Sequence, residues 1–322
     1  MSIVLLWLLL SLCLCLWCCI YTLYTHSLTL YYTLFSRYEH NFEDAHFEHD
    51  RVDAVAMERL TSSPHVINMF GFCGHSVLTE FADGTRVGEL ADKSKKTPLA
   101  RLRIARDIAT GLADVHGIDG DGNATFVHLD INPANVMSIG GTLKLNDFNI
   151  GILLRWNVTS NTQCGFPAQY PNPQWRSPEE AREEENLTEK VDVFSMGHIF
   201  FRLVCGHEPW NKLEPGGRPT KEEVNEKVQR GVLPFVPDKI RNTEDREVAA
   251  IRDAMLRCYT FDPKERPSAR DIANALDAAL MELTGGGPNK EVVVNGGKDE
   301  GGSGEDITKG GDASLSTETT VA

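Results

Sequence analysis

The sequence predicts an α+β fold in which a small sheet precedes a larger, mainly helical lobe. The clearest strand-like run comes early, at Ser76-Val-Leu-Thr-Glu-Phe81, and ends at the turn Ala82-Asp-Gly84. Helical patterns come later, near Val191–Val204 and after Ser268. Segregation of strands and helices along a chain is typical of the α+β class.

Two predicted helices, one after Thr97 and one after Ser268, carry signals at their N-terminal ends. Thr97 is a capping residue type, and Pro98 suits the first helical position. The apolar residues that follow them repeat at helical spacing, at Leu102, Ala105, Ile108, Leu112 and Val115. Ser268 and Asp271 predict a capping box ahead of a second apolar face, formed by Ile272, Leu276 and Leu280.

Composition and charge restrict the function classes. The chain has 322 residues, of which 41% are hydrophobic and 24% charged, as expected for a globular protein. Its formal net charge is −14, which argues against a nucleic-acid partner because such a partner requires a basic surface. The length suits one large domain with extensions.

We divide the chain into three parts. Residues 1–36 form an apolar leader without a Lys, Arg, Asp or Glu, and the run 3–23 is long enough to span about 30 Å of hydrocarbon. Three interpretations of the leader stay open: a membrane segment, an incorrectly assigned start, and a cleaved signal peptide. Residues 37–283 are the globular domain. Residues 284–322 are rich in Gly, Ser, Thr and acidic residues, and this composition predicts a disordered tail.

Polar motifs follow one another through the globular domain. His128-Leu-Asp130 is followed by Asn135, and Asp147-Phe-Asn149 comes after a predicted strand–turn–strand. Each motif alone is a weak signal, and their order and spacing are what make the series specific. The later members are Ser177-Pro-Glu179, Asp192-Val-Phe-Ser-Met-Gly197 and Arg266-Pro267.

This series resembles the eukaryotic protein kinases over residues 37–283. The resemblance implies a bilobal kinase fold, ATP and Mg²⁺ as cofactors, and a protein substrate. It implies that Asp130 accepts the proton of the attacking hydroxyl, and that Asn135 and Asp147 bind magnesium. Transfer to Ser or Thr is expected rather than to Tyr, because of the proline in Asp130-Ile-Asn-Pro-Ala-Asn135.

The resemblance also assigns supporting roles. Glu179 and Arg266 are expected to form an ion pair, and Asp192 to brace the backbone of the catalytic loop that begins at His128. Upstream, Thr79 is expected at the back of the adenine site, with backbone groups of Glu80 and Ala82 facing the purine. Asp53 takes the place of the acid on the first helix, with Glu58 as the alternative.

Several features depart from the family pattern. No glycine-rich loop precedes Arg37, and the chain has no lysine before Lys93, so the first strands of the N-terminal sheet are expected to be truncated. Leu129 stands where most members have an arginine that pairs with a phosphorylated residue. Asn132 replaces a lysine that neutralises the γ-phosphate, and Asn149 replaces a glycine, a mild change because Asn tolerates positive φ.

These departures leave alternatives to an active protein kinase. One is a catalytically impaired pseudokinase that acts as a membrane-tethered binding or scaffold module. Another is a small-molecule phosphotransferase of the aminoglycoside or choline kinase type, against which the motifs from Ser177 onwards argue. A genuine leader implies a single-pass membrane protein with a cytoplasmic kinase domain, and otherwise we expect a cytoplasmic protein.

Overall fold

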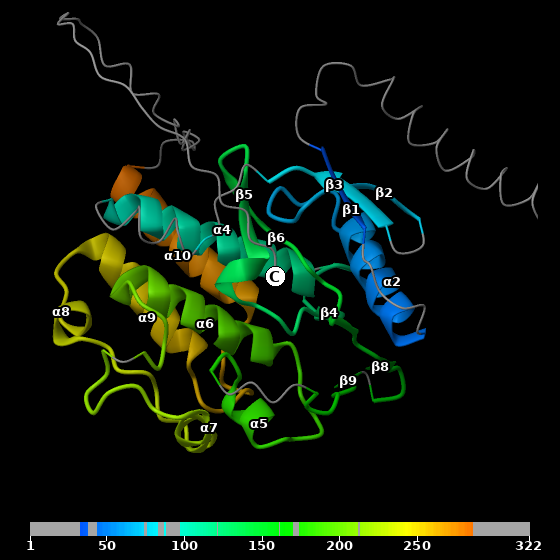
Figure 1. Ribbon diagram of the computed structural model, residues 1–322. Helices are drawn as coiled ribbons and strands as arrows, with labels where there is room; N and C mark the ends of the chain where they lie inside the picture. The colour runs from blue at the N-terminus through cyan, green and yellow to red at the C-terminus, as the bar shows by residue number, and fades with distance from the viewer. Residues whose placement is uncertain are drawn as a thin grey trace, which may run out of the picture. The chain divides into compact units, whose positions relative to one another are not determined.

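The N-terminal part of the protein consists of an antiparallel sheet and a helix (Figure 1). The computed structural model describes residues 33–37, 44–73, 76–82, 87, 97–120, 122–160, 162–169, 174–211 and 213–285. The sheet has the strand order β1-β3-β2, with strands Thr33–Arg37 (β1), Met69–Cys73 (β2) and Ser76–Glu80 (β3). Helix α2, Asp44–Arg59, contacts β2.

Strand β1 begins inside the segment 1–36 that the sequence assigns to the leader. It pairs with β3 in continuous antiparallel register, from Thr33 opposite Glu80 to Arg37 opposite Ser76. The last residues of this segment therefore belong to the sheet. The domain boundaries drawn from the sequence, at residues 37 and 283, otherwise stay predictions.

The apolar run 3–23 and the tail from residue 286 onwards lie outside the described residues. Among the helices that the structure describes, none combines the length and the apolar character that crossing a membrane requires. Membrane association through 3–23 stays a prediction.

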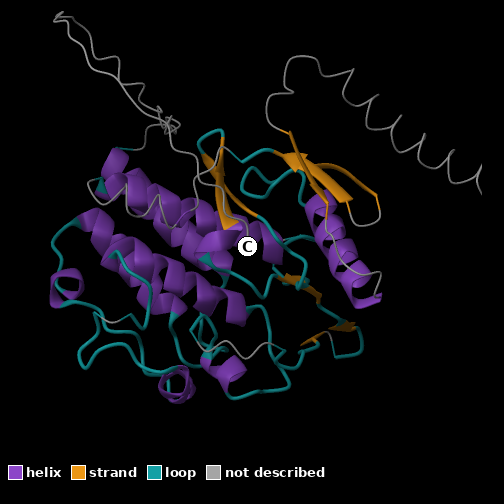
Figure 2. Ribbon diagram, viewed as in Figure 1, coloured by secondary structure: helices purple, strands orange, loops and turns teal. Residues whose placement is uncertain are grey.

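The C-terminal part is mainly helical (Figure 2). Helix α4 packs against α10 and α9, and α6 packs against α9 and α4. The predicted order of strands followed by helices is therefore present. The helices are α4 (Pro98–His116), α5 (Pro178–Ala181), α6 (Lys190–Cys205), α7 (Lys221–Gln229), α8 (Asp238–Arg241), α9 (Arg246–Cys258) and α10 (Ala269–Thr284).

The N-terminal caps predicted for α4 and α10 differ in whether the structure contains them. Helix α4 begins at Pro98 as expected, but the side chain of Thr97 makes no capping hydrogen bond. At α10 the capping box is confirmed, because Ser268 Oγ accepts from Asp271 N and Asp271 Oδ2 accepts from Ser268 N. Proline fixes the first turn of α4 through its φ angle, so the helix starts correctly without the side-chain cap.

Short strands connect the two parts of the domain and support the polar motifs. Strand β5 (Val136–Ile139) pairs with β6 (Thr142–Leu145), and β4 (Phe126–Val127) pairs with β7 (Ile152–Leu153). A further hairpin joins β8 (Trp156–Asn157) to β9 (Thr162–Gln163). The first two pairs flank the motifs at residues 128–135 and 147–149.

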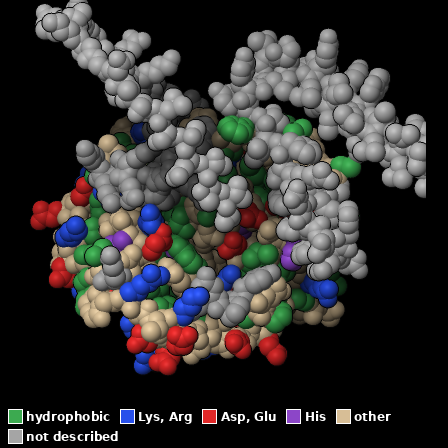
Figure 3. All heavy atoms as spheres, in the orientation of Figure 1, with side chains coloured by type: hydrophobic (Ala, Val, Ile, Leu, Met, Phe, Trp, Pro, Cys, Tyr) green, Lys and Arg blue, Asp and Glu red, His purple; other side chains and the backbone are tan. Residues whose placement is uncertain are grey.

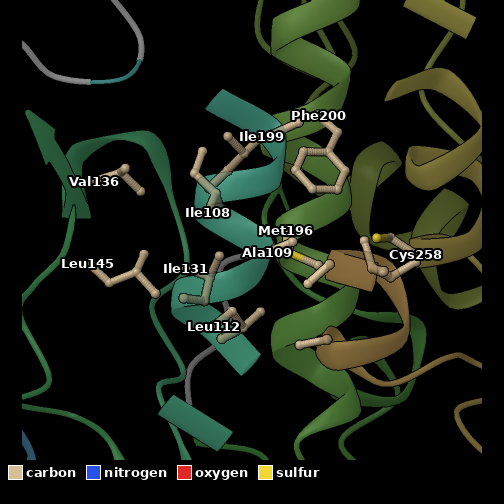
Figure 4. Close-up of a cluster of buried hydrophobic side chains, with 14 of the residues drawn as sticks. Ile108, Ala109, Leu112, Ile131, Val136, Leu145, Met196, Ile199, Phe200 and Cys258 are labelled. Carbon is tan, nitrogen blue, oxygen red and sulfur yellow. The ribbon is translucent and has the colours of Figure 1, made fainter. Parts of the chain in front are cut away.

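The hydrophobic core connects these strands to the helices (Figure 4). Ile108 and Leu112 of α4 face Leu145 of β6 and Ile131 on one side, and Met196 of α6 on the other. All five side chains are buried. Packing on both sides of α4 holds the strands of the candidate site at a fixed distance from the helical bundle.

Helices α6 and α9 approach closely at a glycine. A Cβ atom added at Gly197 would lie 2.9 Å from the Cβ atom of Cys258 and 2.9 Å from the ring of Tyr259. The missing side chain lets α6 press against α9. This contact fixes the position of Asp192, which lies on α6 five residues before Gly197.

Candidate active site

Asp130 and Asn135 lie together in one loop. After Asp130 the chain forms a single 3₁₀ turn at Pro133–Asn135, which returns the side chain of Asn135 to the aspartate. Asn135 Nδ2 donates to Asp130 Oδ2 at 2.8 Å and to the carbonyl oxygen of Asp130 at 2.9 Å. The amide oxygen of Asn135 is thereby directed away from Asp130 and is the atom that could bind a cation.

Asp192 holds the start of this loop. Its buried carboxylate accepts hydrogen bonds from the backbone N–H groups of His128, at 2.7 Å, and Leu129, at 2.9 Å. The Nε2 atom of His116 lies 3.0 Å from the same carboxylate. These contacts are the ones that a bracing role requires.

Leu129 occupies a strained backbone conformation. Its φ is +63°, in the left-handed region that a bulky residue rarely adopts. Its N–H is held by Asp192, and its carbonyl oxygen accepts a hydrogen bond from Arg176 Nη1. Strain of this kind costs about 1–3 kcal/mol and persists only where the surroundings fix it on both sides.

His128 connects the loop to the Asp147 motif. Its Nε2–H donates to the carbonyl oxygen of Asn146 at 3.1 Å, and its ring centroid lies 4.9 Å from that of Phe148. The backbone N–H of Asn146 donates in turn to the carbonyl oxygen of Asn135 at 3.1 Å. Asp130, Asn135 and Asp147 are therefore neighbours, as the sequence predicts from motifs that are separated along the chain.

In the motif Asp147-Phe-Asn149, the left-handed backbone conformation occurs at the first residue and not at the third, where the sequence predicts it. Asp147 has φ +66°, whereas Asn149 is not among the described residues with positive φ. Asp is one of the residue types that tolerate this region. The replacement of glycine by Asn149 is mild for a different reason than the sequence suggested, because the position does not require positive φ.

Asp147 carries the electrostatic signature of a cation site. Burial raises the pKa of its carboxyl group and Asp130 raises it further, while His128 and the backbone N–H of Asn149 lower it. A divalent cation would relieve this repulsion. Magnesium is usually bound by one or two carboxylates together with water and substrate phosphates, so Asp147 and the amide oxygen of Asn135 are a suitable set.

Asp53 reaches the same motif from helix α2. Its side chain is 4% exposed, and Oδ1 accepts a hydrogen bond from the backbone N–H of Phe148 at 2.7 Å. Burial raises the pKa of Asp53 to about 7, and Asp147 and Asp50 add to the rise. Glu58, the alternative, is exposed on the same helix. No cation among the described residues forms a salt bridge with Asp53.

The predicted adenine contacts lie at the end of β3. Thr79 is buried, and Ala82 is half-buried just beyond the strand. The backbone N–H of Glu80 donates to the carbonyl oxygen of Asn68 at 3.0 Å and is therefore occupied. This leaves the carbonyl oxygen of Glu80 and the backbone of Ala82 as the predicted purine contacts.

The side chain of Glu80 is held in place by contacts that its sequence context does not indicate. Its Oε1 accepts from Lys144 Nζ at 2.5 Å and from the backbone N–H of Asn68 at 2.7 Å. Lys144 lies on β6, three residues before Asp147. The pair joins the end of the N-terminal sheet to the strand that precedes the predicted magnesium ligand Asp147.

Glu179 and Arg266 form a buried, bidentate ion pair. The Nη1–Oε1 distance is 2.6 Å and the Nη2–Oε2 distance is 3.1 Å, and the two side chains are 2% and 0% exposed. Arg266 also donates to the carbonyl oxygens of Lys190 and Thr260. The expected pair is thus present and connects α5 to the segment before α10.

Asn132 has a local structural role. Its Oδ1 accepts from the backbone N–H of Ala134 at 2.7 Å, and its Nδ2 donates to the carbonyl oxygen of Asp130 at 3.2 Å. The side chain therefore caps the 3₁₀ turn and does not extend as a lysine would. The site lacks this phosphate donor, but the turn that positions Asn135 is reinforced.

Comparisons with known proteins agree with this geometry. A family model described as the protein kinase domain matches residues 38–276, which is more than half of the chain. Serine/threonine-protein kinase 12 of Arabidopsis thaliana is 26% identical over 72% of this chain and 48% of its own length. Mitogen-activated protein kinase kinase kinase 7 of Bos taurus is 26% identical over 69% of this chain and 36% of its own length.

A third relative is the dual specificity protein kinase pyk3 of Dictyostelium discoideum, 25% identical over 66% of this chain and 14% of its own length. The chain thus spans less than half the length of these curated relatives.

The raised pKa of Asp53 predicts a pH-dependent effect of its substitution. Between the ordinary pKa of 3.8 and about 7, the unfolded chain loses the Asp53 proton while the folded protein keeps it, so stability falls as the pH rises through this range. The full difference corresponds to about 4 kcal/mol. Asp53→Asn keeps an acceptor for Phe148 N–H and should remove this dependence.

We therefore expect the stability of Asp53→Asn relative to the wild type to increase from about pH 4 to about pH 7 and then to level off. Urea denaturation at a series of pH values measures it. Glu58→Gln, on the exposed face of the same helix, is the control and should show no such trend. A stability difference for Asp53→Asn that is independent of pH would contradict the assignment.

Proposed function

This chain belongs to the protein kinase family, and we propose that it transfers the γ-phosphate of ATP to serine or threonine hydroxyl groups of a protein substrate. The observation that carries the proposal is the contact of 2.8 Å between Asp130 and Asn135, beside Asp147. A base and two candidate magnesium ligands lie in one site. Phosphoryl transfer needs positioning and charge neutralisation more than covalent chemistry. A base and two metal ligands are the types of residue that supply these two functions.

Each residue has a separate task in this proposal. Asp130 accepts the proton of the attacking hydroxyl group. The amide oxygen of Asn135 and the carboxylate of Asp147 hold magnesium, which neutralises charge on the phosphates when bound. Thr79 closes the back of the adenine site. The carbonyl oxygen of Glu80 accepts a hydrogen bond from the purine, and the backbone of Ala82 forms further hydrogen bonds with it.

The preference for serine and threonine is supported by the relatives and by the loop. Serine/threonine-protein kinase 12 carries this specificity in its name, whereas pyk3 is named as a dual specificity kinase. Pro133, the first residue of the 3₁₀ turn, is the residue on which the sequence-based expectation rested. Tyrosine transfer is the outcome that the assay below distinguishes.

Phosphate transfer tests the proposal directly. The full chain is incubated with Mg²⁺ and ATP labelled at the γ-phosphate, and label is counted on a generic basic protein and assigned to Ser, Thr or Tyr. We expect transfer to Ser or Thr that falls by about 10²–10⁴ in Asp130→Asn, because a positioned base is lost. Glu222→Gln, on the exposed face of α7, is the control. Equal transfer by wild type and Asp130→Asn would contradict the role of Asp130.

A second candidate function is that of a pseudokinase, and one observation favours it. Strand β1 pairs with β3, with Ser36 opposite Val77, and its five residues contain no lysine. The family pattern places on this strand a lysine that holds the phosphates. Arg37 is the one basic residue of β1. The strand as described therefore lacks the lysine that the family uses for the phosphates.

Restoring a cation at this position separates the two candidates. If the missing charge limits catalysis, Ser36→Lys should raise phosphate transfer by about 10²–10³, the usual effect of one well-placed donor. Arg37→Lys, which keeps the charge of the next residue of β1, is the matched control and should change little. Mg²⁺-dependent ATP binding without transfer, in the wild type and in Ser36→Lys alike, would favour the pseudokinase.

A further inference from the structure

A cleft lies among helices α7, α8 and α9, and none of the residues that line it belongs to the candidate active site. Its volume is about 520 Å³, within the range of about 300–1,000 Å³ usual for ligand sites. The chain segments that form it are the loop after α6, helix α7, the stretch 232–236, and helices α8 and α9. The proposed phosphate transfer assigns this cleft no role.

The inner wall of the cleft is held rigidly. Trp210 is buried and has φ +59°, a conformation that a bulky residue rarely adopts. Glu214 Oε1 accepts from the backbone N–H of Trp210 at 2.9 Å and from that of Phe235 at 3.4 Å. One buried carboxylate thus ties the two sides of the cleft together. The shape is therefore set before a ligand arrives, which lowers the entropy cost of binding.

Lys227 places a positive charge at the cleft. Its Nζ lies 5.7 Å from the centre of the Trp210 ring, a cation–π contact. Among the residues that the structure describes, no carboxylate forms a salt bridge with Lys227. Glu214 of the same cleft interacts electrostatically with Lys227 but accepts from two backbone N–H groups, so an incoming anion has no salt bridge to displace at Lys227.

Two arginines add positive charge at the edge. Arg252 forms a salt bridge with its neighbour Asp253 and donates to the carbonyl oxygen of Arg241. Arg241 pairs with Asp238, and these two side chains are 59% and 80% exposed. The exposed Arg241–Asp238 pair contributes only about 0–1 kcal/mol, so a ligand carboxylate can compete with it. Arg252 is less accessible, because its side chain is 18% exposed.

The cationic character is local. The chain as a whole has a net charge of −14, and on the face shown in Figure 3 acidic and basic side chains are interspersed. A nucleic acid would need a broad basic surface, which this charge distribution does not offer. A ligand with a few negative charges would be attracted to the cleft and repelled elsewhere.

Exposed apolar side chains lie beside these cations. Val232 and Leu256 line the cleft and are 45% and 46% exposed. Covering them removes apolar surface from water, at about 25 cal/mol per Å². The ligand that satisfies both features has apolar groups flanked by carboxylates.

We propose that this cleft binds an acidic peptide segment of a partner protein. An apolar side chain of the peptide covers Val232 and Leu256, and neighbouring Asp or Glu carboxylates pair with Lys227 and Arg241. Apolar anchors and satisfied charge pairs are the usual sources of affinity and of specificity in such contacts. This inference does not depend on whether the chain transfers phosphate.

The test uses an array of short peptides in which the two central positions vary among apolar residues and the flanking positions between Asp and Glu. Matched arrays carry Ser at the centre or Lys on the flanks. We expect members of the first array to bind the full chain, and the matched members to bind at least about tenfold more weakly, a loss of about 1.4 kcal/mol.

Substitutions in the chain locate the binding. Lys227→Glu and Leu256→Ser should each weaken binding at least about tenfold. Lys221→Glu reverses an exposed charge at the start of the same helix, outside the cleft, and should leave binding unchanged. Circular dichroism checks that each variant is folded, and the phosphate-transfer rate should stay at the wild-type level.

Three results would overturn the proposal. The first is that no member of the acidic array binds the wild type. The second is that Lys221→Glu weakens binding as much as Lys227→Glu does. The third is that vesicles containing phosphatidylserine bind in a Lys227-dependent manner while the peptides do not, which would assign the surface to a membrane.

Discussion

The candidate active site depends on the carboxylate of Asp192. It lies in the core on α6 and accepts hydrogen bonds from two consecutive backbone N–H groups, those of His128 and Leu129. A buried carboxylate needs such partners, because an unpaired one costs several kcal/mol. The two hydrogen bonds compensate the charge of Asp192, and they also keep the backbone of Leu129 at φ +63°. The backbone at Leu129 in turn fixes the orientation of the next residue, Asp130.

The remaining contacts extend this constraint to the predicted metal ligands. His128 holds the carbonyl oxygen of Asn146, Asn135 holds Asp130, and Asp53 holds the backbone of Phe148 from helix α2. Each of these bonds joins segments that are distant in sequence or fixes a turn within the loop. The acid on α2 needs no lysine in this arrangement, since burial raises its pKa to about 7 and a backbone N–H is its partner. The geometry of the loop can thus persist in a chain that departs from the family in its first strands.

Much of this could be predicted from the sequence, because motif order and spacing identify residues such as Asp130, Glu179 and Arg266, and because capping residues and apolar periodicity mark helices such as α10. Other features depend on tertiary contacts that spacing does not encode. The bond from Lys144 to Glu80 joins residues 64 positions apart. The role of Asn132 as a cap follows from the local turn, whereas the sequence comparison showed only a missing lysine. Positive φ at Asp147, and the cleft beside Trp210, likewise arise from packing between elements.

Asp192 holds the catalytic loop in its strained form through its two hydrogen bonds to the backbone N–H groups of His128 and Leu129. Hydrogen exchange of the full chain, compared between the wild type and Asp192→Asn, measures this restraint. Asparagine retains one acceptor and presents an N–H₂ group to the second backbone N–H, so one buried donor loses its partner at a cost of about 1–3 kcal/mol. We expect exchange over residues 126–136 to become about tenfold faster or more, while exchange in α10 stays as in the wild type. Unchanged exchange over 126–136, or an equal increase throughout the protein, would contradict it.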